Sequence, residues 1–264
     1  MNKTKLPLGR ETDYPQKYSP EVLCPIARTG DREQFRGVDI WNAWELSWLG
    51  RGGLPRVATA EIHVPADSPN IVESKSLKLY LNSYSMSPFE SETAVAEAIA
   101  RDLESCVGAP VKARVLPVAN TEGRHVARLA GACLDDLDVT CTDWDVNADL
   151  LRSDPSSVVA EDVHTHLLRS LCPVTAQPDI GSLQISYRGP QIDHEGLLRY
   201  LVSYREHNDF HEACIERMFV DLMERCDCEE LTVQARYQRR GGIDINPFRT
   251  NGREKPLNLR LWRQ

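Results

Sequence analysis

The sequence lacks long hydrophobic runs. Charged residues interrupt every apolar stretch well before the roughly 20 residues that a membrane-spanning helix needs. The N-terminal stretch Met-Asn-Lys-Thr-Lys-Leu-Pro leads into no apolar segment of the kind that a secretory signal carries. We therefore expect a soluble, cytoplasmic protein with no membrane partner.

Positive charge is scarce as well. Lys and Arg together number 31 against 39 for Asp and Glu, which gives a formal net charge of -8 at pH 7. Such a chain has little general attraction for a phosphate backbone, so we expect no direct nucleic-acid partner. The hydrophobic share of 41% and the length of 264 residues are those of a globular protein with one large domain or two modest ones.

Several binding-site motifs are missing. No G-x-G-x-x-G follows a predicted strand and no G-x-x-x-x-G-K-[ST] occurs, so neither a Rossmann dinucleotide site nor a P-loop is expected. Paired Cys-x-x-Cys knuckles are absent, and neither the Cys-Asp-Cys at 226–228 nor the His-Thr-His at 164–166 alone supplies four tetrahedral ligands. We expect no metal, and without a signal segment the 8 cysteines are interpreted as reduced thiols.

Hydrophobic periodicity predicts strands, a helix and strands in the first half of the chain. Residues 71–84 alternate between apolar and polar, as in a half-buried strand. Residues 90–107 have helical spacing, and 112–118 alternate again. The first sixty residues are rich in turn formers, so we expect an irregular cover or a short helix there.

The second half repeats this order. Residues 181–187 and 231–239 have the pattern of strands. Two amphipathic helices are predicted between them, at 193–205 and 209–225.

A polar, loop-forming stretch at 149–157 is the best candidate boundary, and we place the division near residue 155. This gives an N-terminal module, 1–155, and a C-terminal module, 156–264. The similar element order suggests two copies of one α+β unit, each an antiparallel sheet with helices packed on one face, although no residue-by-residue repeat is visible. Polar antiparallel strands also invite pairing between subunits, so we expect a homodimer.

Cys172 is the first candidate for chemistry. It lies in a proline-flanked loop, which favours exposure and a role as nucleophile, because a thiolate must reach its substrate. Asp179 follows seven residues later, and a carboxyl held in a desolvated pocket keeps its proton and can act as a general acid. The alternatives are a small buried hydrophobic residue for Cys172 and a turn residue for Asp179.

The string Phe210-His211-Glu212 stands at the start of a predicted helix. With Asp209 as the N-cap, Asp209 and Glu212 fit a capping box, so structure alone explains Glu212. The same position at the positive end of a helix keeps a carboxylate ionised and able to accept paired N–H groups from a guanine-like ring. Both interpretations stay open.

Two further clusters combine cations with small residues. In the Glu-Ser-Lys-Ser string at 73–76, hydroxyls around a lysine could hold phosphate while Glu73 accepts from a heterocycle; the alternative is the solvated face of a strand. Arg240 and Gly241 place a cation beside flexible backbone after the last predicted strand. That arrangement suits either an anion site or a hairpin turn.

Four strings carry a resemblance to a known family: Glu-Ser-Lys-Ser-Leu-Lys-Leu-Tyr-Leu-Asn-Ser from 73, Cys-Pro-Val-Thr-Ala-Gln-Pro-Asp from 172, Phe-His-Glu from 210 and Arg-Arg-Gly-Gly from 239. They resemble the NADPH-dependent 7-cyano-7-deazaguanine reductases, the nitrile reductases of queuosine biosynthesis in tRNA modification. The similarity spans most of the chain and is to the long, two-module type. It implies two tandem tunnelling-fold modules, a small-molecule substrate and NADPH as the cofactor.

The resemblance also implies a role for each motif. Cys172 would attack the nitrile carbon to form a covalent thioimide, Asp179 would give a proton to the nitrogen, and His211 would lie beside the reacting centre. Two hydride transfers would then give 7-aminomethyl-7-deazaguanine. The residues implied to bind the substrate are Glu73, Ser74, Lys75, His211 and Glu212, and those implied to contact the cofactor are Lys75, Ser76, Arg240 and Gly241.

Cys214 matches a position that in relatives can pair oxidatively with the nucleophile, so the resemblance suggests redox protection of Cys172. The competing prediction is a tunnelling-fold relative that binds a purine or pterin without reducing it, or that hydrolyses it as cyclohydrolases do. Such hydrolases need a metal-activated water, and the sequence offers no convincing ligand set for the metal.

Overall fold

The computed structural model describes residues 14–30, 32–120 and 125–264, which form two compact units. Unit 1 takes the described residues of Met1–Gly30, Asp39–His125 and Arg239–Ile245, and unit 2 takes those of Asp31–Val38, Val126–Gln238 and Asn246–Gln264. Two strands, β2 (Arg36–Leu49) and β10 (Ile243–Thr250), contribute residues to both units.

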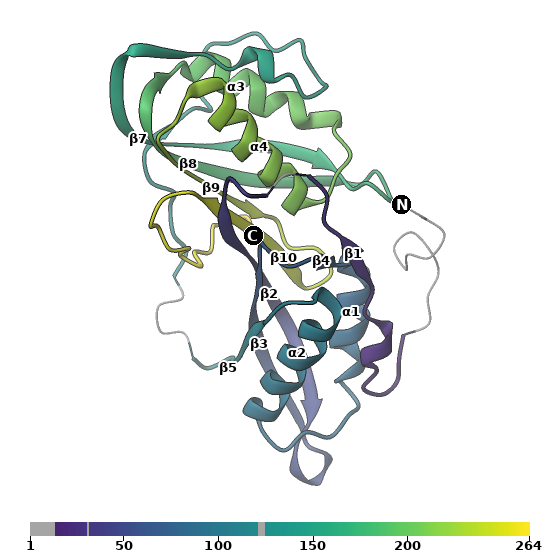
Figure 1. Cartoon of the computed structure of the whole chain (residues 1–264). Helices are drawn as coiled ribbons and strands as arrows, with labels where there is room; N and C mark the ends of the chain where they lie inside the picture. The colour runs from purple at the N-terminus through teal and green to yellow at the C-terminus, as the bar shows by residue number, and fades with distance from the viewer. Residues whose placement is uncertain (1–13, 31, 121–124) are drawn as a thin grey trace. The chain divides into compact units, whose positions relative to one another are not determined.

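Unit 1 contains a sheet in which β3 lies between β2 and β5, with two helices packed on one face (Figure 1). β3 pairs antiparallel with β5, and a separate two-stranded antiparallel sheet joins β1 to β4. The remaining elements of this unit are η2 (Pro20–Val22), β1 (Pro25–Ala27), η3 (Arg51–Gly53), β3 (Pro55–Pro65), β4 (Asn70–Val72), α1 (Ser74–Ser83), α2 (Glu92–Val107) and β5 (Lys112–Pro117).

The core of unit 1 follows from strand and helix periodicity. Along β3 every second side chain from Ala58 to Val64 is buried, as expected for a strand with one covered face. α2 buries Val95, Ala98, Ile99, Leu103 and Val107, one stripe along the helix. The helix prediction at 90–107 and the strand prediction at 112–118 are confirmed within two residues at each end.

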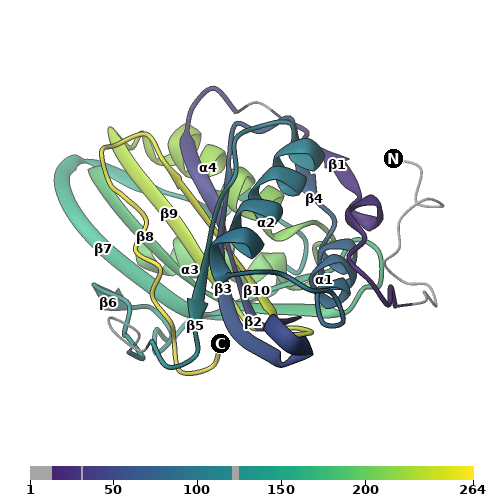
Figure 2. The same ribbon diagram turned by 90° about the horizontal axis from the view of Figure 1, so that it is seen from below.

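Unit 2 has the strand order β10-β9-β8-β7-β6, with α3 and α4 covering one face of β7, β8 and β9 (Figure 2). The strands from β7 to β10 pair antiparallel, and only the short β6 runs parallel to its neighbour β7. The remaining elements are β6 (Ala132–Cys133), η4 (Ala148–Leu150), β7 (Ser153–Leu171), β8 (Pro178–Ile192), α3 (His194–Val202), η5 (Ser203–Glu206), α4 (His211–Cys226) and β9 (Glu230–Tyr237).

The fold class expected from the sequence is confirmed, because each unit is an α+β layer structure with a mainly antiparallel sheet and helices on one face. The strand predictions at 181–187 and 231–239 and the helix predictions at 193–205 and 209–225 are confirmed as β8, β9, α3 with η5, and α4. No helix of the described residues is both long enough and apolar enough to cross a membrane.

A buried tyrosine network fastens the two helices of unit 1 together. The hydroxyls of Tyr80 and Tyr84, one turn apart on α1, lie 2.5 Å from each other. Tyr80 also donates to Asp102 of α2 at 2.7 Å, and Ser83 donates to the Tyr80 carbonyl at 2.6 Å. Burial is the main cause that raises the pKa of both tyrosines, so each hydroxyl keeps its proton and can donate it.

Unit 2 contains the same network. The hydroxyls of Tyr200 and Tyr204 lie 2.9 Å apart, Tyr200 donates to Asp221 of α4 at 2.7 Å, and Ser203 donates to the Tyr200 carbonyl at 2.6 Å. The sequence Tyr-Leu-x-Ser-Tyr therefore occurs at 80–84 and again at 200–204. The modules show no clear residue-by-residue repeat as a whole, but this short repeat carries the contact between the helices of each unit.

The strand predicted at 71–84 is wrong. These residues form the end of β4 and then α1. Three leucines at alternate positions mimic a period of two. The helix buries a wider face, which also includes Tyr80 between two of those leucines. The carboxylate of Glu73 fixes the start of the helix by accepting two of its first N–H groups.

Two other expectations are corrected. The first sixty residues hold β2 and β3 rather than an irregular cover, and β2 is buried without alternation from Asp39 to Ala43, so period two is lost there. Residue 155 lies inside β7, which begins at Ser153, so the polar stretch at 149–157 is not a linker. Its residues from 153 onward begin a long strand, in which positions 154–156 are exposed.

Candidate active site

Cys172 and Asp179 stand on either side of one hairpin loop in unit 2. Leu171 ends β7 opposite Pro178 of β8, and Ser170 pairs with Asp179. The Cys172 N–H donates to the Gln177 carbonyl at 3.0 Å and closes the loop. The thiol and the carboxyl are seven residues apart because a six-residue loop, 172–177, and the first residue of β8 separate them.

A second backbone contact brings the start of α4 to this loop. Leu171 donates its N–H to the His207 carbonyl at 2.8 Å and accepts from the Asp209 N–H at 3.1 Å, which makes a parallel bridge with Asn208. Since α4 begins at His211, its first residues follow directly from this bridge. Cys172 follows directly from Leu171 on the other strand.

Strand alternation places the candidate side chains on one face of the sheet. Successive residues of a strand point to opposite faces and paired residues point to the same face, so Ser170, Asp179 and Gly181 share a face, as does Tyr237, which pairs with Gly181. Gly181 has no side chain that would crowd the Tyr237 ring, since a Cβ on it would lie 3.2 Å from that ring. This is the face that carries the contacts of Asp179 and Tyr237 with His211.

His211 is held between a carboxylate and an aromatic ring. Its Nε2 lies 3.2 Å from Oδ2 of Asp179, and its ring stacks on Tyr237 at a centroid distance of 3.8 Å and an interplanar angle of 9°. The Nδ1 atom is buried and has no hydrogen-bond partner among the described residues. A buried ring nitrogen without a partner is costly unless a ligand completes it, so this atom marks the site.

The groups around His211 are buried and acidic. Burial is the largest cause that raises the pKa of the Tyr237 hydroxyl, and the nearby Asp179 and Glu212 raise it further. Burial likewise raises the pKa of the Cys214 thiol, with Asp209, Asp179 and Glu212 adding to the effect. Tyr237 and Cys214 therefore keep their protons at neutral pH, and Cys214 is a poor nucleophile.

The predicted cap of α4 is corrected. Phe210, not Asp209, is the N-cap, and it makes no side-chain hydrogen bond with the helix. The Asp209 carboxylate instead accepts the Phe210 N–H at 2.8 Å. Glu212 is only 3% exposed at the second helical position, so the capping-box explanation for this buried acid no longer holds.

Cys172 is more enclosed than its loop setting predicts. Only 6% of the residue is exposed, because the loop folds over it: the Ala176 N–H donates to the Cys172 carbonyl at 2.9 Å. The expectation of an exposed thiol is therefore wrong. Cys172 and Cys214 are both free thiols, so the disulfide between them suggested by the family stays a prediction.

Glu73, in unit 1, caps the N-terminus of α1. One carboxylate oxygen accepts the Lys75 N–H at 2.7 Å and the other accepts the Ser76 N–H at 2.8 Å. Burial raises the pKa of this carboxyl, and the two N–H bonds together with Lys78 and Lys75 oppose the rise. The 73–76 string is thus a helix start and not the face of a strand.

The duplicated unit provides an internal comparison for Glu73. Asp193 occupies the same place before α3, seven residues ahead of Tyr200, as Glu73 is seven ahead of Tyr80. Asp193 caps its helix through the Gly196 N–H from an exposed position, whereas Glu73 has no exposed surface. Capping alone does not require a buried acid, so capping does not explain the burial of Glu73, and its role toward the substrate stays a prediction.

The three residues after Glu73 differ in how deeply they are buried. The Ser76 hydroxyl is fully buried, donates to the Glu73 carbonyl at 2.7 Å and accepts the Cys24 N–H at 3.0 Å. Ser76 therefore holds the helix start inside the unit. Ser74 and Lys75 are half-buried, and their roles toward substrate and cofactor stay predictions.

Arg240 and Gly241 lie in the tight turn before β10. The Arg240 N–H donates to the Ile243 carbonyl at 2.9 Å, and Gly241 and Gly242 both have positive φ, 59° and 80°. The Lys78 side chain packs against this turn: a Cβ on Gly241 would lie 3.1 Å from its Cδ and 3.8 Å from Nζ. Unit 1 therefore brings a lysine of α1 to an exposed glycine turn beside an arginine.

Comparison with known proteins identifies the family. A profile described as nitrile reductase, 7-cyano-7-deazaguanine-reductase N-term matches residues 14–115, and one described as QueF-like protein matches 178–256. The chain belongs to the 7-cyano-7-deazaguanine reductase family. The first match includes Glu73 and the second includes Asp179, His211 and Glu212, whereas Cys172 precedes the second match.

A solved structure is also similar to part of this chain. It is described as the crystal structure of the archaeosine synthase QueF-Like in the apo form. It is 18% identical, covers 38% of this chain and 97% of its own, and has a TM-score of 0.32.

Sequence reasoning missed three features of this reductase-family chain. Tyr237 was expected only as a core residue of the last strand, and its stacking on His211 has no local sequence signal. Lys78 was placed on a strand, so its contact with the glycine turn was hidden. Cys133, which lies next to the two histidines of 164–166, was not considered with them.

The loop over Cys172 carries a strained residue, which gives a first prediction. Ala176 is exposed and has φ of 54°, in the left-handed region that costs a residue with a Cβ about 1–2 kcal/mol. Glycine avoids this cost but loses about 0.5–1 kcal/mol of backbone entropy. We expect Ala176→Gly to stabilise the fold by about 0.5–1 kcal/mol, measured as a higher midpoint in urea unfolding.

Ala96→Gly in the middle of α2 is the matched control and should destabilise by about 1 kcal/mol. If Ala176→Gly were as destabilising as this control, the left-handed conformation of the loop would be contradicted.

Proposed function

We propose that this protein reduces the nitrile of 7-cyano-7-deazaguanine to 7-aminomethyl-7-deazaguanine with NADPH, in queuosine biosynthesis. The family supports a nitrile reductase. The observation that carries the proposal is His211, which contacts Asp179 through one ring nitrogen and has the other ring nitrogen buried without a described partner, next to the loop that holds Cys172.

The first step uses the chain's own groups. The Cys172 sulfur bonds to the nitrile carbon while the nitrile nitrogen takes a proton, so that S–H adds across the triple bond and gives a thioimide. Asp179 is the proposed donor of the proton to nitrogen. Covalent capture turns a weak electrophile into a C=N group that is easier to reduce, which is the gain from nucleophilic catalysis.

The contact between His211 Nε2 and Asp179 Oδ2, at 3.2 Å, gives the carboxyl a route for reprotonation. The stacked Tyr237 ring fixes the plane of the His211 imidazole. The Nδ1 atom, which has no hydrogen-bond partner among the described residues, therefore has a fixed orientation. Glu212, a buried acid at the start of α4, is proposed to accept N–H groups of the deazaguanine ring.

The residues of unit 1 fit a phosphate-bearing cofactor. Lys75, Lys78 and Arg240 are cations, and the exposed Gly241 lies beside the Lys78 side chain, whereas Glu45 packs against Gly242. NADPH, when bound, supplies the hydrides. Reduction of one nitrile needs two hydrides and two protons, and it gives the aminomethyl product and frees the Cys172 thiol. No Rossmann turn is needed for this mode of binding.

The central test combines turnover with intact-mass measurement. We expect the wild-type protein to consume two NADPH per nitrile and, without NADPH, to gain the mass of the nitrile substrate. Cys172→Ala should show neither the adduct nor turnover while still binding the substrate, because it lacks the sulfur. Cys141→Ala, at a partly exposed cysteine of the same unit, is the control and should keep both.

An adduct that persists in Cys172→Ala would reassign the nucleophile. Tight binding of the nitrile by the wild-type protein without NADPH consumption would instead support a protein that binds a purine-like ring without reducing it.

The role of Asp179 gives a third prediction. Asp179→Asn keeps a hydrogen-bonding side chain beside His211 but loses the acid proton, so we expect turnover to fall by about 10²-fold or more. The circular dichroism spectrum should not change. Asp162→Asn, at an exposed carboxylate of β7, should leave turnover unaffected; unchanged turnover in Asp179→Asn would remove this carboxyl from the mechanism.

The glycine turn gives a fourth prediction. Lys78→Gln removes the cation beside Gly241, so we expect KM for NADPH to rise by about tenfold with little change in KM for the nitrile. Lys112→Gln, at an exposed lysine of β5, is the matched control. Equal KM values for NADPH in the two variants would place the cofactor phosphates elsewhere.

A further inference from the structure

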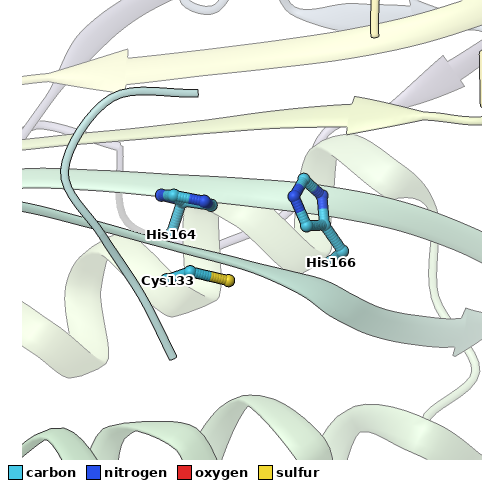
Figure 3. A group of neighbouring side chains, drawn as sticks. All are labelled: Cys133, His164 and His166. Atoms are coloured by element: carbon cyan, nitrogen blue, oxygen red, sulfur yellow. The ribbon is translucent and has the colours of Figure 1, made fainter. Parts of the chain in front are cut away.

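Cys133, His164 and His166 form a cluster of metal-ligating side chains in unit 2. Their ligand atoms all lie within 4.8 Å of one another (Figure 3). Cys133 is exposed and both histidines are half-buried, so the cluster opens to solvent. The proposed reaction of Cys172 uses none of these residues.

The fold positions this cluster through the parallel pairing of β6 with β7. Cys133 pairs with His164, so the two side chains stand on the same side of neighbouring strands. His166 lies two residues beyond His164 on β7 and therefore points to the same face. Three ligands thus come from two short pieces of strand.

The approach of β6 depends on Gly131. This residue has φ of 83°, and a Cβ on it would lie 1.8 Å from the Asp162 carbonyl oxygen. Beyond β6, the Asp135 carboxylate accepts from the Thr165 hydroxyl at 2.6 Å and from the His166 N–H at 3.1 Å. The segment that carries Cys133 is therefore fixed to β7 on both sides of the thiol.

Each imidazole is oriented by a hydrogen bond at Nδ1. His164 Nδ1 lies 3.0 Å from the Ala130 carbonyl, which can only accept, so Nδ1 carries the hydrogen and the neutral ring presents the lone pair of Nε2. His166 Nδ1 lies 2.8 Å from the Ser182 hydroxyl. Histidines that bind metals in proteins are oriented by such bonds to their other nitrogen.

Charged residues on both sides hold the backbone of His166. The Asp135 carboxylate accepts the His166 N–H, whereas Arg263 donates to the His166 carbonyl. Asp135 also contributes a negative charge near the cluster.

We propose that Cys133, His164 and His166 bind one Zn²⁺ ion, with water as the fourth ligand. A thiolate and two neutral imidazoles are typical zinc ligands, and at bond lengths of about 2.3 Å and 2.0 Å their atoms lie about 3.3–3.6 Å apart in a tetrahedron. Closing a separation of up to 4.8 Å to this value needs about 1 Å of movement, which the exposed Cys133 side chain can supply.

The zinc site is separate from the proposed active site. Ser182, which contacts His166, follows Gly181 on β8 and so points to the face opposite that of Asp179. His166 also lies six residues before Cys172, about 20 Å along an extended strand. The ion would fasten residues 126–152, where the regular elements are only β6 and η4, to β7.

Cobalt provides the direct test, because Co²⁺ takes tetrahedral zinc sites and its bond to a thiolate gives a charge-transfer band. We expect the full chain, stripped with a chelator, to bind one Co²⁺ with that band and with tetrahedral d–d bands, both lost when Zn²⁺ is added. Cys133→Ser should lose the charge-transfer band, and both Cys133→Ser and His164→Gln should bind at least tenfold more weakly.

Two controls keep the zinc test independent of the proposed reaction. Cys141→Ser and Cys172→Ala should both keep the wild-type cobalt spectrum, and circular dichroism should show that each variant is folded. The proposal is overturned if folded Cys133→Ser keeps the thiolate band, if Cys172→Ala loses it, or if the wild-type protein binds no stoichiometric Co²⁺ or Zn²⁺.

Discussion

The candidate active site depends on a few backbone hydrogen bonds at the end of β7. Leu171 donates to the His207 carbonyl and accepts from the Asp209 N–H, so the chain entering α4 runs beside the last residue of the strand. Without that bridge, His211 would have no fixed relation to the loop that begins at Cys172. Side-chain contacts, such as that of His211 with Asp179, follow from this backbone arrangement.

The hairpin of β7 and β8 has a different group of polar residues on each of its two faces. One face carries Asp179 and Tyr237, which hold His211 in a buried, acidic setting. The other face carries the open cluster with His166, where the ligands reach solvent. Because alternate residues of a strand point to opposite faces, the proposed proton-transfer site and the proposed zinc site can lie on one hairpin without competing for the same groups.

The sequence predicts the elements with clear periodicity, such as α2, and the motif residues, but not the contacts between distant segments. The strand predicted at 71–84 fails because three alternate leucines imitate period two, while the deciding signal is the burial of Tyr80 between them. The exposed position expected for Cys172 fails because loop residues fold back onto it. That closure uses backbone hydrogen bonds within the loop, and a pattern of apolar and polar residues does not show them.

The duplicated units show which residues the fold requires and which the chemistry requires. Both units keep the tyrosine pair and its aspartate acceptor, because these bonds fasten one helix to the other. The helix starts differ: Asp193 caps α3 from the surface, whereas Glu73 does the same for α1 with no exposed surface. The exposed Asp193 shows that capping does not need a buried carboxylate, and burying one costs stability. The predicted role of Glu73 in binding would account for that cost.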